Sequence, residues 1–249
     1  MPESYYENQR VLQEYLLFHY GEDAANMPWS VGPQSGLRFP QRCVSEGLDP
    51  RRLPNPSRAL DLGCAVGRST FELAGHCDEV IGIDFSHAFI LTARTLCRER
   101  VLPFEYFECG EMMQSTEAKV PDVDCSRVSF EVGDAQNLRS DLGQFDVVLA
   151  ANLLCRLPRP QLLLERLPTL VKPGGQLILT TPNTWLESFT GPDFWIGGRP
   201  STGTTLEVLE ERIGSSFERI KRADLPFSIR EHARKFQWSV AEMSVWIRR

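Results

Sequence analysis

Residues 58–72 read Arg-Ala-Leu-Asp-Leu-Gly-Cys-Ala-Val-Gly-Arg-Ser-Thr-Phe-Glu. The short apolar run 58–62 is followed at once by a turn that begins at Gly63 and ends at Gly67. Ser69 and Glu72 stand at the spacing of a capping box, which predicts that a helix begins there. Glycines at such a turn let the backbone approach a ligand closely, and the amino end of the helix offers unpaired N–H groups. The stretch therefore predicts a ligand-binding turn between a strand and a helix.

The rest of the chain continues this alternation. Apolar runs predict strands at 80–84, 128–132, 145–150 and 176–180, and two more at 217–220 and 239–247. Helical spacing predicts helices over 86–100 and 162–171, and Thr204 with Glu207 forms a second capping box. Strands that alternate with helices in this way indicate an α/β protein with a doubly wound, mostly parallel sheet and helices on both faces.

Three stretches lie outside the alternation. Residues 1–56 form an N-terminal helical cap with one amphipathic helix and a loop rich in Pro and Gly over 27–40. Residues 103–127 are an insertion before the third strand, and 182–203 form a long loop rich in Gly, Pro and aromatic residues. Because loops of this length are usually functional or disordered, and neither of the last two carries a long charged run, we expect both to be ordered lids. We expect residues 1–249 to form a single domain with its core at 57–249.

Composition narrows the class of protein. The 249 residues are 42% hydrophobic and 24% charged, and 27 basic against 33 acidic residues give a net charge of −6. This mild acidity, without basic runs, argues against a nucleic-acid binder. Neither an apolar run of about 18 residues nor the apolar segment of a signal peptide is present, so we expect no membrane contact. The seven cysteines include no CxxC pair and the four histidines are dispersed. These patterns predict no metal site and a reducing, cytoplasmic location.

Acidic residues follow the predicted strands where a ligand would bind. Asp84 ends the second strand, about twenty residues after the glycine turn, where a carboxylate can accept both hydroxyls of a ribose. Asp134 follows the third strand, although a helix-capping role is an alternative there. Asp146 precedes its apolar run instead of ending it, so we expect it to be structural. The glycine turn and Asp84 would also suit a nicotinamide-dependent oxidoreductase, but the turn lacks a complete GxGxxG pattern.

The ordered set of motifs resembles that of class I S-adenosylmethionine-dependent methyltransferases over about residues 56–182. The set comprises Asp61-Leu62-Gly63-Cys64-Ala65-Val66-Gly67, Gly82-Ile83-Asp84, Gly133-Asp134-Ala135, Phe145-Asp146-Val147-Val148 and Leu170-Val171-Lys172-Pro173-Gly174-Gly175. The resemblance implies a Rossmann-like, seven-stranded sheet with an antiparallel last strand, and S-adenosylmethionine as cofactor with S-adenosylhomocysteine as product. It further implies that Asp84 binds the ribose, that Asp134 and Ala135 meet the adenine and that Asn152 lies near the methionine end.

The resemblance also assigns the turn residues and the residue after Asp84 to the cofactor site, namely Asp61, Gly63, Cys64, Ala65, Gly67 and Phe85. The family usually has glycine at the position of Ala65. We expect the extra methyl group to fit if φ at that position stays negative.

Further segments resemble the methyltransferase module of ovothiol biosynthesis, and this likeness extends over essentially the whole chain. They are Tyr5-Tyr6-Glu7, Glu14-Tyr15-Leu16-Leu17-Phe18-His19-Tyr20-Gly21, Gly82 to Ile90, Ala151-Asn152-Leu153-Leu154-Cys155-Arg156-Leu157 and Ile229 to Glu242. The resemblance implies N-methylation of the π nitrogen of 5-thiohistidine. It also implies a sulfoxide synthase as partner, fused or separate. Another small amine, imidazole or thiol as acceptor, or an inactive module that serves a partner protein, are the alternatives.

A small zwitterionic imidazole needs a slot for its ring and partners for its charges. We expect substrate contacts from Tyr5, Tyr6, Asn183, Trp185, Phe194, Trp195, Arg230, His232, Arg234 and Gln237. Arginine can hold a carboxylate through two hydrogen bonds, and aromatic rings can enclose the imidazole and favour the sulfonium. The catalytic candidates are His232, as a base, with Tyr6 and Asn152. Packing is the alternative for Trp185 and Trp195, a solvated face for Arg234, and a structural role for His232. We expect Tyr15 and His19 to pack within the amphipathic helix.

Overall fold

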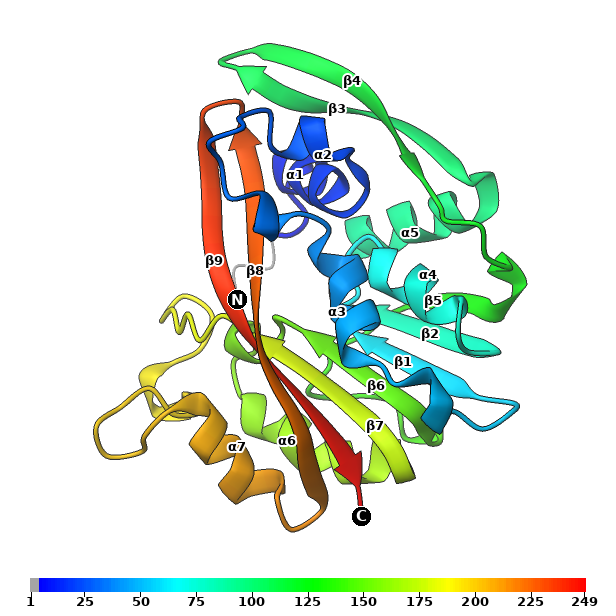
Figure 1. Ribbon diagram of the computed structural model, residues 1–249, viewed down its shortest axis with the longest axis vertical. Helices are drawn as coiled ribbons and strands as arrows, with labels where there is room; N and C mark the ends of the chain where they lie inside the picture. The colour runs from blue at the N-terminus through cyan, green and yellow to red at the C-terminus, as the bar shows by residue number, and fades with distance from the viewer. Residues whose placement is uncertain (1–4) are drawn as a thin grey trace.

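The computed structural model describes residues 5–249 and is built on one seven-stranded sheet (Figure 1). The strand order is β5-β2-β1-β6-β7-β9-β8. The first five strands in this order are parallel to one another, and β9 is antiparallel to both of its neighbours, β7 and β8. The bounds are β1 (Arg58–Leu62), β2 (Glu79–Asp84), β5 (Val128–Val132), β6 (Phe145–Ala151), β7 (Val171–Thr181), β8 (Phe217–His232) and β9 (Lys235–Arg248). The predicted fold class is confirmed.

Helices cover both faces of this sheet, as predicted. On one face, α6 (Pro160–Leu170) and α7 (Thr205–Ile213) share an apolar core with β1, β2 and β6. On the other, α3 (Phe39–Gly47) and α4 (Arg68–Ala74) pack on β1, β6, β7 and β9, and α5 (His87–Glu99) packs beside α4 and β5. The side chains of β6 are buried from Phe145 to Ala150 because helices lie on both sides of it. Asp146 accepts hydrogen bonds from the Arg58 N–H and the Lys172 ammonium, which is the expected structural role.

One of the two predicted capping boxes is confirmed, and the helix predicted from residue 86 has a cap as well. Ser86 caps α5 by accepting from the Phe89 N–H, and Thr204 and Glu207 form the capping box of α7. The capping box predicted for Ser69 and Glu72 is wrong. The helix α4 begins one residue earlier, after Gly67, and the Ser69 hydroxyl instead donates to Asp61.

The N-terminal cap consists of α1 (Gln9–Tyr20), α2 (Asp23–Asn26) and α3. Figure 1 shows α1 between the hairpin of β3 (Val101–Cys109) and β4 (Met112–Lys119) and the outer half of β8–β9. Short 3-10 turns complete the described part of the chain at Gln34–Gly36, Pro50–Arg52, Cys125–Arg127, Ser140–Leu142, Leu154–Arg156 and Pro192–Phe194. Within residues 5–249, none of the helices is long and apolar enough to cross a membrane.

Two hairpins were missed or shortened by the sequence patterns. The insertion at 103–127, expected to be a lid, is ordered, but most of it belongs to the β3–β4 hairpin that packs on α1, and none of its residues lines the cavity at the carboxyl ends of the parallel strands. The strands expected at 217–220 and 239–247 extend to 16 and 14 residues and pair from Phe217↔Arg248 to His232↔Lys235. Beyond the core, these strands are rich in charged residues and lack the alternation that marks a half-buried strand. They are stabilised by contacts with α1 and β3, which no local pattern reveals.

Candidate active site

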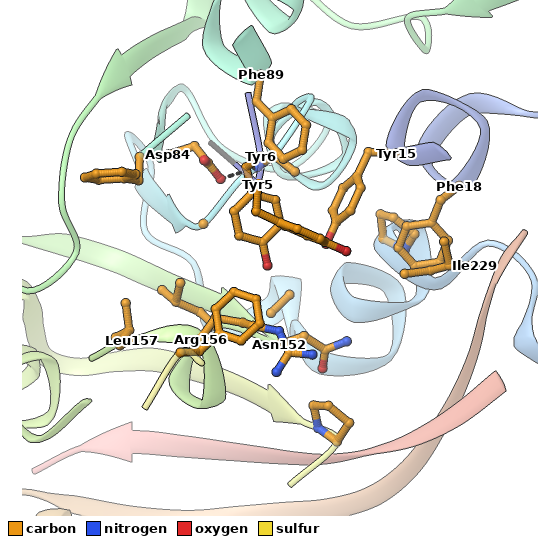
Figure 2. A pocket seen from close by; sticks show the side chains of 18 of the residues that line it. Tyr5, Tyr6, Tyr15, Phe18, Asp84, Phe89, Asn152, Arg156, Leu157 and Ile229 are labelled. Carbon is orange, nitrogen blue, oxygen red and sulfur yellow. Dashed lines mark hydrogen bonds between the residues drawn. The ribbon is translucent and has the colours of Figure 1, made fainter. Parts of the chain in front are cut away.

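A cavity of about 500 Å³ opens at the carboxyl ends of the parallel strands. This is where ligands bind in open α/β sheets, and the volume lies in the ordinary range of ligand pockets. One end is lined by the turns after β1, β2 and β5, and the other by α1, by the loop after β7 and by β8–β9. Figure 2 shows the side chains of Tyr5, Tyr6, Tyr15, Asn152 and Arg156 converging on this space.

The glycine turn forms the floor of the first end. The N–H groups of Gly63 and Cys64 donate to the Ile83 carbonyl at 2.8 and 3.1 Å, which ties the turn to β2. Gly63 and Ala65 line the cavity, with φ of 70° and 47°. The expectation of a negative φ at Ala65 is therefore wrong. An alanine in the left-handed region costs about 1–2 kcal/mol, and the Ala65 N–H partly offsets it by donating to Asp84 at 2.9 Å.

Three of the expected turn residues support the floor and do not line the cavity. The Asp61 carboxylate accepts from the hydroxyls of Ser69 and Thr70, both at 2.7 Å, and so ties β1 to α4. Cys64 is buried. A Cβ on Gly67 would lie 2.7 Å from the Phe130 ring, which explains the glycine by close packing.

Asp84 lies at the edge of the cavity with both carboxylate oxygens engaged by backbone. Oδ2 accepts from Ala65 and Oδ1 from the Ser86 N–H, each at 2.9 Å. Burial raises the pKa of Asp84 to about 6 despite these hydrogen bonds. The carboxylate is thus fixed in place and incompletely solvated, so additional donors from a ligand would stabilise its charged form.

The remaining residues expected at the cofactor site also line the cavity. Phe85 follows Asp84, Asp134 and Ala135 follow the neighbouring strand β5, and Asn152 follows β6. Asp134 accepts from the Gln136 N–H at 2.8 Å, so its carboxylate stabilises a turn and not the start of a helix. The same residue also lines the cavity. Asn152 is held at φ 52° because its N–H donates to Thr180 and its side-chain oxygen accepts from the Thr180 hydroxyl.

At the other end, the structure brings together Tyr5, Tyr6 and Gln237 of the expected substrate residues. The rings of Tyr5 and Tyr6 lie 6.0 and 6.2 Å from that of Phe189, so the N-terminal segment meets the loop after β7. Burial raises the pKa of Tyr6 to about 12, so its hydroxyl stays protonated. The described N-terminal segment and the loop together cover the cavity, in keeping with the expected lid role of 182–203.

The four other expected loop residues do not line the cavity. The indole N–H of Trp185 donates to Thr205 at 3.3 Å and that of Trp195 to the Thr190 carbonyl at 2.9 Å, so both rings serve packing. The side-chain amide of Asn183 donates to Glu242, and the guanidinium of Arg159 lies over the Phe194 ring. The polar groups of Asn183, Trp185 and Trp195 are thus hydrogen-bonded within the protein.

The same holds for three residues expected on the segment before the last strand. Arg230 is buried, donates to the Glu108 carboxylate and the Ala25 carbonyl, and so joins β8 to the β3–β4 hairpin and the cap. His232 lies at the hairpin end, where its Nδ1 accepts from the Arg234 N–H at 3.3 Å. The guanidinium of Arg234 lies over the exposed indole ring of Trp29 in the N-terminal cap. His232 is therefore not a base at the cavity, because it lies at the end of the β8–β9 hairpin and does not line the cavity.

Several polar residues line the cavity although the sequence patterns do not predict it. Tyr15, expected to pack within its helix, is one of them, and three others are Glu14 and His19 on α1 and Arg156 after β6. His19 stands on the apolar side of an amphipathic helix, a pattern that predicts packing, and no local signal in the sequence distinguishes Glu14 from a solvent-exposed carboxylate. Arg156 lies in a short 3-10 turn whose place at the cavity follows from the sheet order.

Comparison with known proteins agrees with this geometry. The family model described as "Methyltransferase domain" matches residues 55–223. The chain belongs to this methyltransferase family. Its cofactor end is that of a class I, S-adenosylmethionine-dependent methyltransferase domain, which excludes the oxidoreductase alternative.

Individual relatives are distant from this methyltransferase domain. A ubiquinone biosynthesis O-methyltransferase of Coxiella burnetii is 27% identical over 124 residues, which is 50% of this chain and 43% of that protein. One of Methylococcus capsulatus is 30% identical over 132 residues, 53% and 46% of the two chains. The chain thus spans about half the length of the curated relatives it matches. A solved methyltransferase of Methanosarcina mazei, 20% identical, superposes with a TM-score of 0.52 over 81% of this chain and 98% of that one, which supports the fold alone.

The residues at the cofactor end fit S-adenosylmethionine. The half-buried carboxylate of Asp84 at the cavity edge suits vicinal hydroxyl donors. A Cβ at Gly63 would lie 3.0 Å from Leu153 of the cavity lining, at a φ of 70° that favours glycine, so only a residue without a side chain fits this turn easily. Within residues 5–249, no group of three or more His, Cys, Asp or Glu side chains could hold a metal ion.

Proposed function

We propose that the protein transfers a methyl group from S-adenosylmethionine to the π nitrogen of 5-thiohistidine, as in ovothiol biosynthesis. In this proposal Asp84 binds the ribose, Asp134 and Ala135 meet the adenine, and Asn152 lies at the methionine end. The sulfoxide synthase expected as partner belongs to the same proposal. The acceptor rests on the resemblance along the whole chain and on the chemistry of the second end of the cavity.

The observation that carries the proposal is the pair of opposite charges at that end. Glu14 is 13% exposed, and burial raises the pKa of its carboxyl although Arg10 partly compensates it. Arg156 lies 4.9 Å from the Phe189 ring and donates to the Cys155 and Thr184 carbonyls, which leaves further donors for a ligand. A substrate carboxylate at Arg156 and a substrate ammonium at Glu14 would match the two charged groups of an α-amino acid.

Aromatic side chains complete this end of the cavity. The rings of Tyr6 and Tyr15 lie 6.0 Å apart at nearly right angles, and Phe89 lies 4.9 Å from Tyr15. A flat heteroaromatic ring fits among such walls better than a flexible aliphatic amine would. The walls also exclude water, which leaves a ring nitrogen poorly solvated and therefore reactive.

Bound S-adenosylmethionine supplies an electrophilic methyl group, so the nitrogen lone pair forms the N–C bond while the S–C bond breaks and its electrons stay on sulfur. A thiolate on the substrate ring balances the positive charge that the ring gains, so no proton has to leave in this step. The protein's contribution is then orientation and exclusion of water, which can supply about 7–11 kcal/mol in favourable cases.

Calorimetry and mass spectrometry test the proposal. We expect S-adenosylhomocysteine to bind, and a mixture of the protein, S-adenosylmethionine and 5-thiohistidine to yield a product heavier by one methyl group. Histidine and a phenolic acceptor serve as matched comparators and should react at least tenfold more slowly. Cofactor binding without methylated 5-thiohistidine would overturn the acceptor and favour another small amine, imidazole or thiol. No cofactor binding would favour the inactive partner module.

A further inference from the structure

His19 is a buried polar side chain that the fold does not use. It lies in the last turn of α1, is 6% exposed and lines the cavity. The rings of Phe18 and Tyr15 lie 5.4 and 6.0 Å from its imidazole. Its Nδ1 atom has no hydrogen-bond partner within residues 5–249. Buried polar atoms are nearly always hydrogen-bonded in folded proteins, so an imidazole without a partner among the described residues is available to a ligand in the cavity.

The imidazole of His19 is neutral at physiological pH. Burial, and then the nearby charge of Arg68, lower its pKa to about 3. A neutral imidazole carries one N–H and one lone pair, and rotation of the ring exchanges the nitrogen that faces the cavity. His19 is therefore a poor acceptor of a full proton but a competent acceptor of a hydrogen bond.

The surroundings select the kind of donor that His19 can accept. The positive charge of Arg68 disfavours an ammonium group beside it, and Glu14 in the same cavity is the better partner for such a cation. The flanking rings of Tyr15 and Phe18 favour a flat group. A neutral N–H on an aromatic ring meets all three conditions.

We propose that His19 accepts a hydrogen bond from the N–H at the far side of the substrate's imidazole ring and thereby selects which ring nitrogen is methylated. This inference rests on the proposed function for the identity of the ring. A neutral imidazole has one N–H and one nitrogen with a free lone pair. Holding the τ N–H at His19 leaves the lone pair on the π nitrogen, which is the atom that attacks. His19 is thus a substrate-binding residue that determines the site of methylation.

Two substitutions at this position test the inference. His19→Phe keeps a flat, buried ring and removes the acceptor, whereas His19→Gln restores an acceptor oxygen. His76→Phe is the matched control, because His76 is exposed and does not line the cavity. The first measurement is calorimetric binding of 5-thiohistidine to the protein loaded with S-adenosylhomocysteine, where no turnover takes place. The second is the ratio of π- to τ-methylated product under S-adenosylmethionine, determined by NMR.

We expect His19→Phe to bind 5-thiohistidine at least tenfold more weakly and to lose preference for the π nitrogen. Its affinity for S-adenosylhomocysteine should change less than twofold, and its melting temperature should not fall, since an orphaned polar atom is removed. His19→Gln should recover much of the binding and selectivity, and His76→Phe should match the wild type. Unchanged binding and product ratio in His19→Phe would overturn the inference.

The binding arm separates this inference from the proposed function. If the wild type binds 5-thiohistidine without methylating it, the proposed function fails, and the binding of His19→Phe still decides the role of His19. If the wild type binds neither 5-thiohistidine nor histidine, both proposals fail together.

Discussion

The two ends of the cavity are built in different ways. The cofactor end comes from turns after β1, β2, β5 and β6, whose relative positions follow from one parallel sheet. The substrate end comes from α1, Arg156 in the turn after β6, the loop after β7 and the β8–β9 hairpin, which meet through packing between segments far apart in the chain. The difference suggests that cofactor contacts follow local motifs, whereas acceptor contacts can change with the packed segments while the sheet stays the same.

Asp84→Ala is expected to have the largest effect, and this effect should be confined to cofactor affinity. It removes the carboxylate that would accept the ribose hydroxyls, and two charge-assisted hydrogen bonds of about 1.5–3 kcal/mol each would correspond to a loss of at least 100-fold in affinity. Calorimetry with S-adenosylhomocysteine measures this. The control is Asp122→Ala, a substitution of an aspartate outside the cavity, which should bind normally. Equal affinities for the two variants would remove Asp84 from the cofactor site.

Arg156→Ala should strike the substrate end alone. It removes the guanidinium proposed to hold the acceptor's carboxylate, so KM for 5-thiohistidine should rise by about 10- to 100-fold, in line with about 1.5–3 kcal/mol for a hydrogen bond to a charged group. Affinity for S-adenosylhomocysteine should stay within twofold. Arg212→Ala on the outer surface of α7 is the matched control. A loss of cofactor affinity equal to the loss for the acceptor would show that the two ends are not separable.

Glu108→Gln tests whether tertiary contacts stabilise the substrate end. Arg230 is 2% exposed at its side chain and Glu108 is 35% exposed, so removal of the carboxylate charge leaves a buried guanidinium less well compensated. We expect a loss of about 2 kcal/mol, below the 3–5 kcal/mol of fully buried pairs because solvent screens Glu108. Thermal unfolding measures this loss. Glu117→Gln on the same hairpin is the control, since its ion pair with Lys119 is exposed at both side chains. Equal melting temperatures for the two variants would contradict the expectation.

Cofactor affinity should depend on pH through Asp84. The free protein holds this carboxyl at a pKa of about 6, above its usual value, because of burial. Ribose hydroxyls favour the ionised form, so a proton must leave when the cofactor binds below that pH. We therefore expect a constant Kd for S-adenosylhomocysteine above pH 7 and an increase of about tenfold per unit below about pH 6. Asp84→Asn should abolish this slope. A slope that persists would assign the titration to Asp61, whose pKa burial also raises to about 6.

Ala65→Gly should have the smallest effect. Glycine relieves the left-handed backbone at φ 47° but adds entropy to the unfolded chain, so a net gain of up to about 1 kcal/mol is expected. The melting temperature should then rise by up to about 2–4 °C. Ala59→Gly within β1 is the opposite control and should lower it. A fall for Ala65→Gly would mean that the methyl group contributes packing that outweighs the strain.

The sequence predicted more of the first end than of the second. The glycine turn, Asp84 and Asp134 were placed at the cavity because each follows a recognisable strand, and the carboxyl ends of parallel strands share one edge of the sheet. The predicted substrate contacts of Arg230 and His232 are wrong, because the apolar runs in the sequence do not reveal the course of the long β8–β9 hairpin. Ile229 of β8 lines the cavity, so the side chain of Arg230 faces the opposite side of the strand, where it donates to Glu108. His232 lies at the end of the β8–β9 hairpin.

By itself, the amino-acid sequence determined the alternation of strands and helices, the parallel core and the residues of the cofactor turn, because these follow from periodicity and from local backbone requirements. Only the tertiary structure decided that Glu14, His19 and Arg156 face one cavity and that the tryptophans of the long loop do not. Such choices depend on packing between segments that are distant in the chain. A helix pattern shows that one side is buried, but it does not show whether that side meets apolar side chains or a ligand.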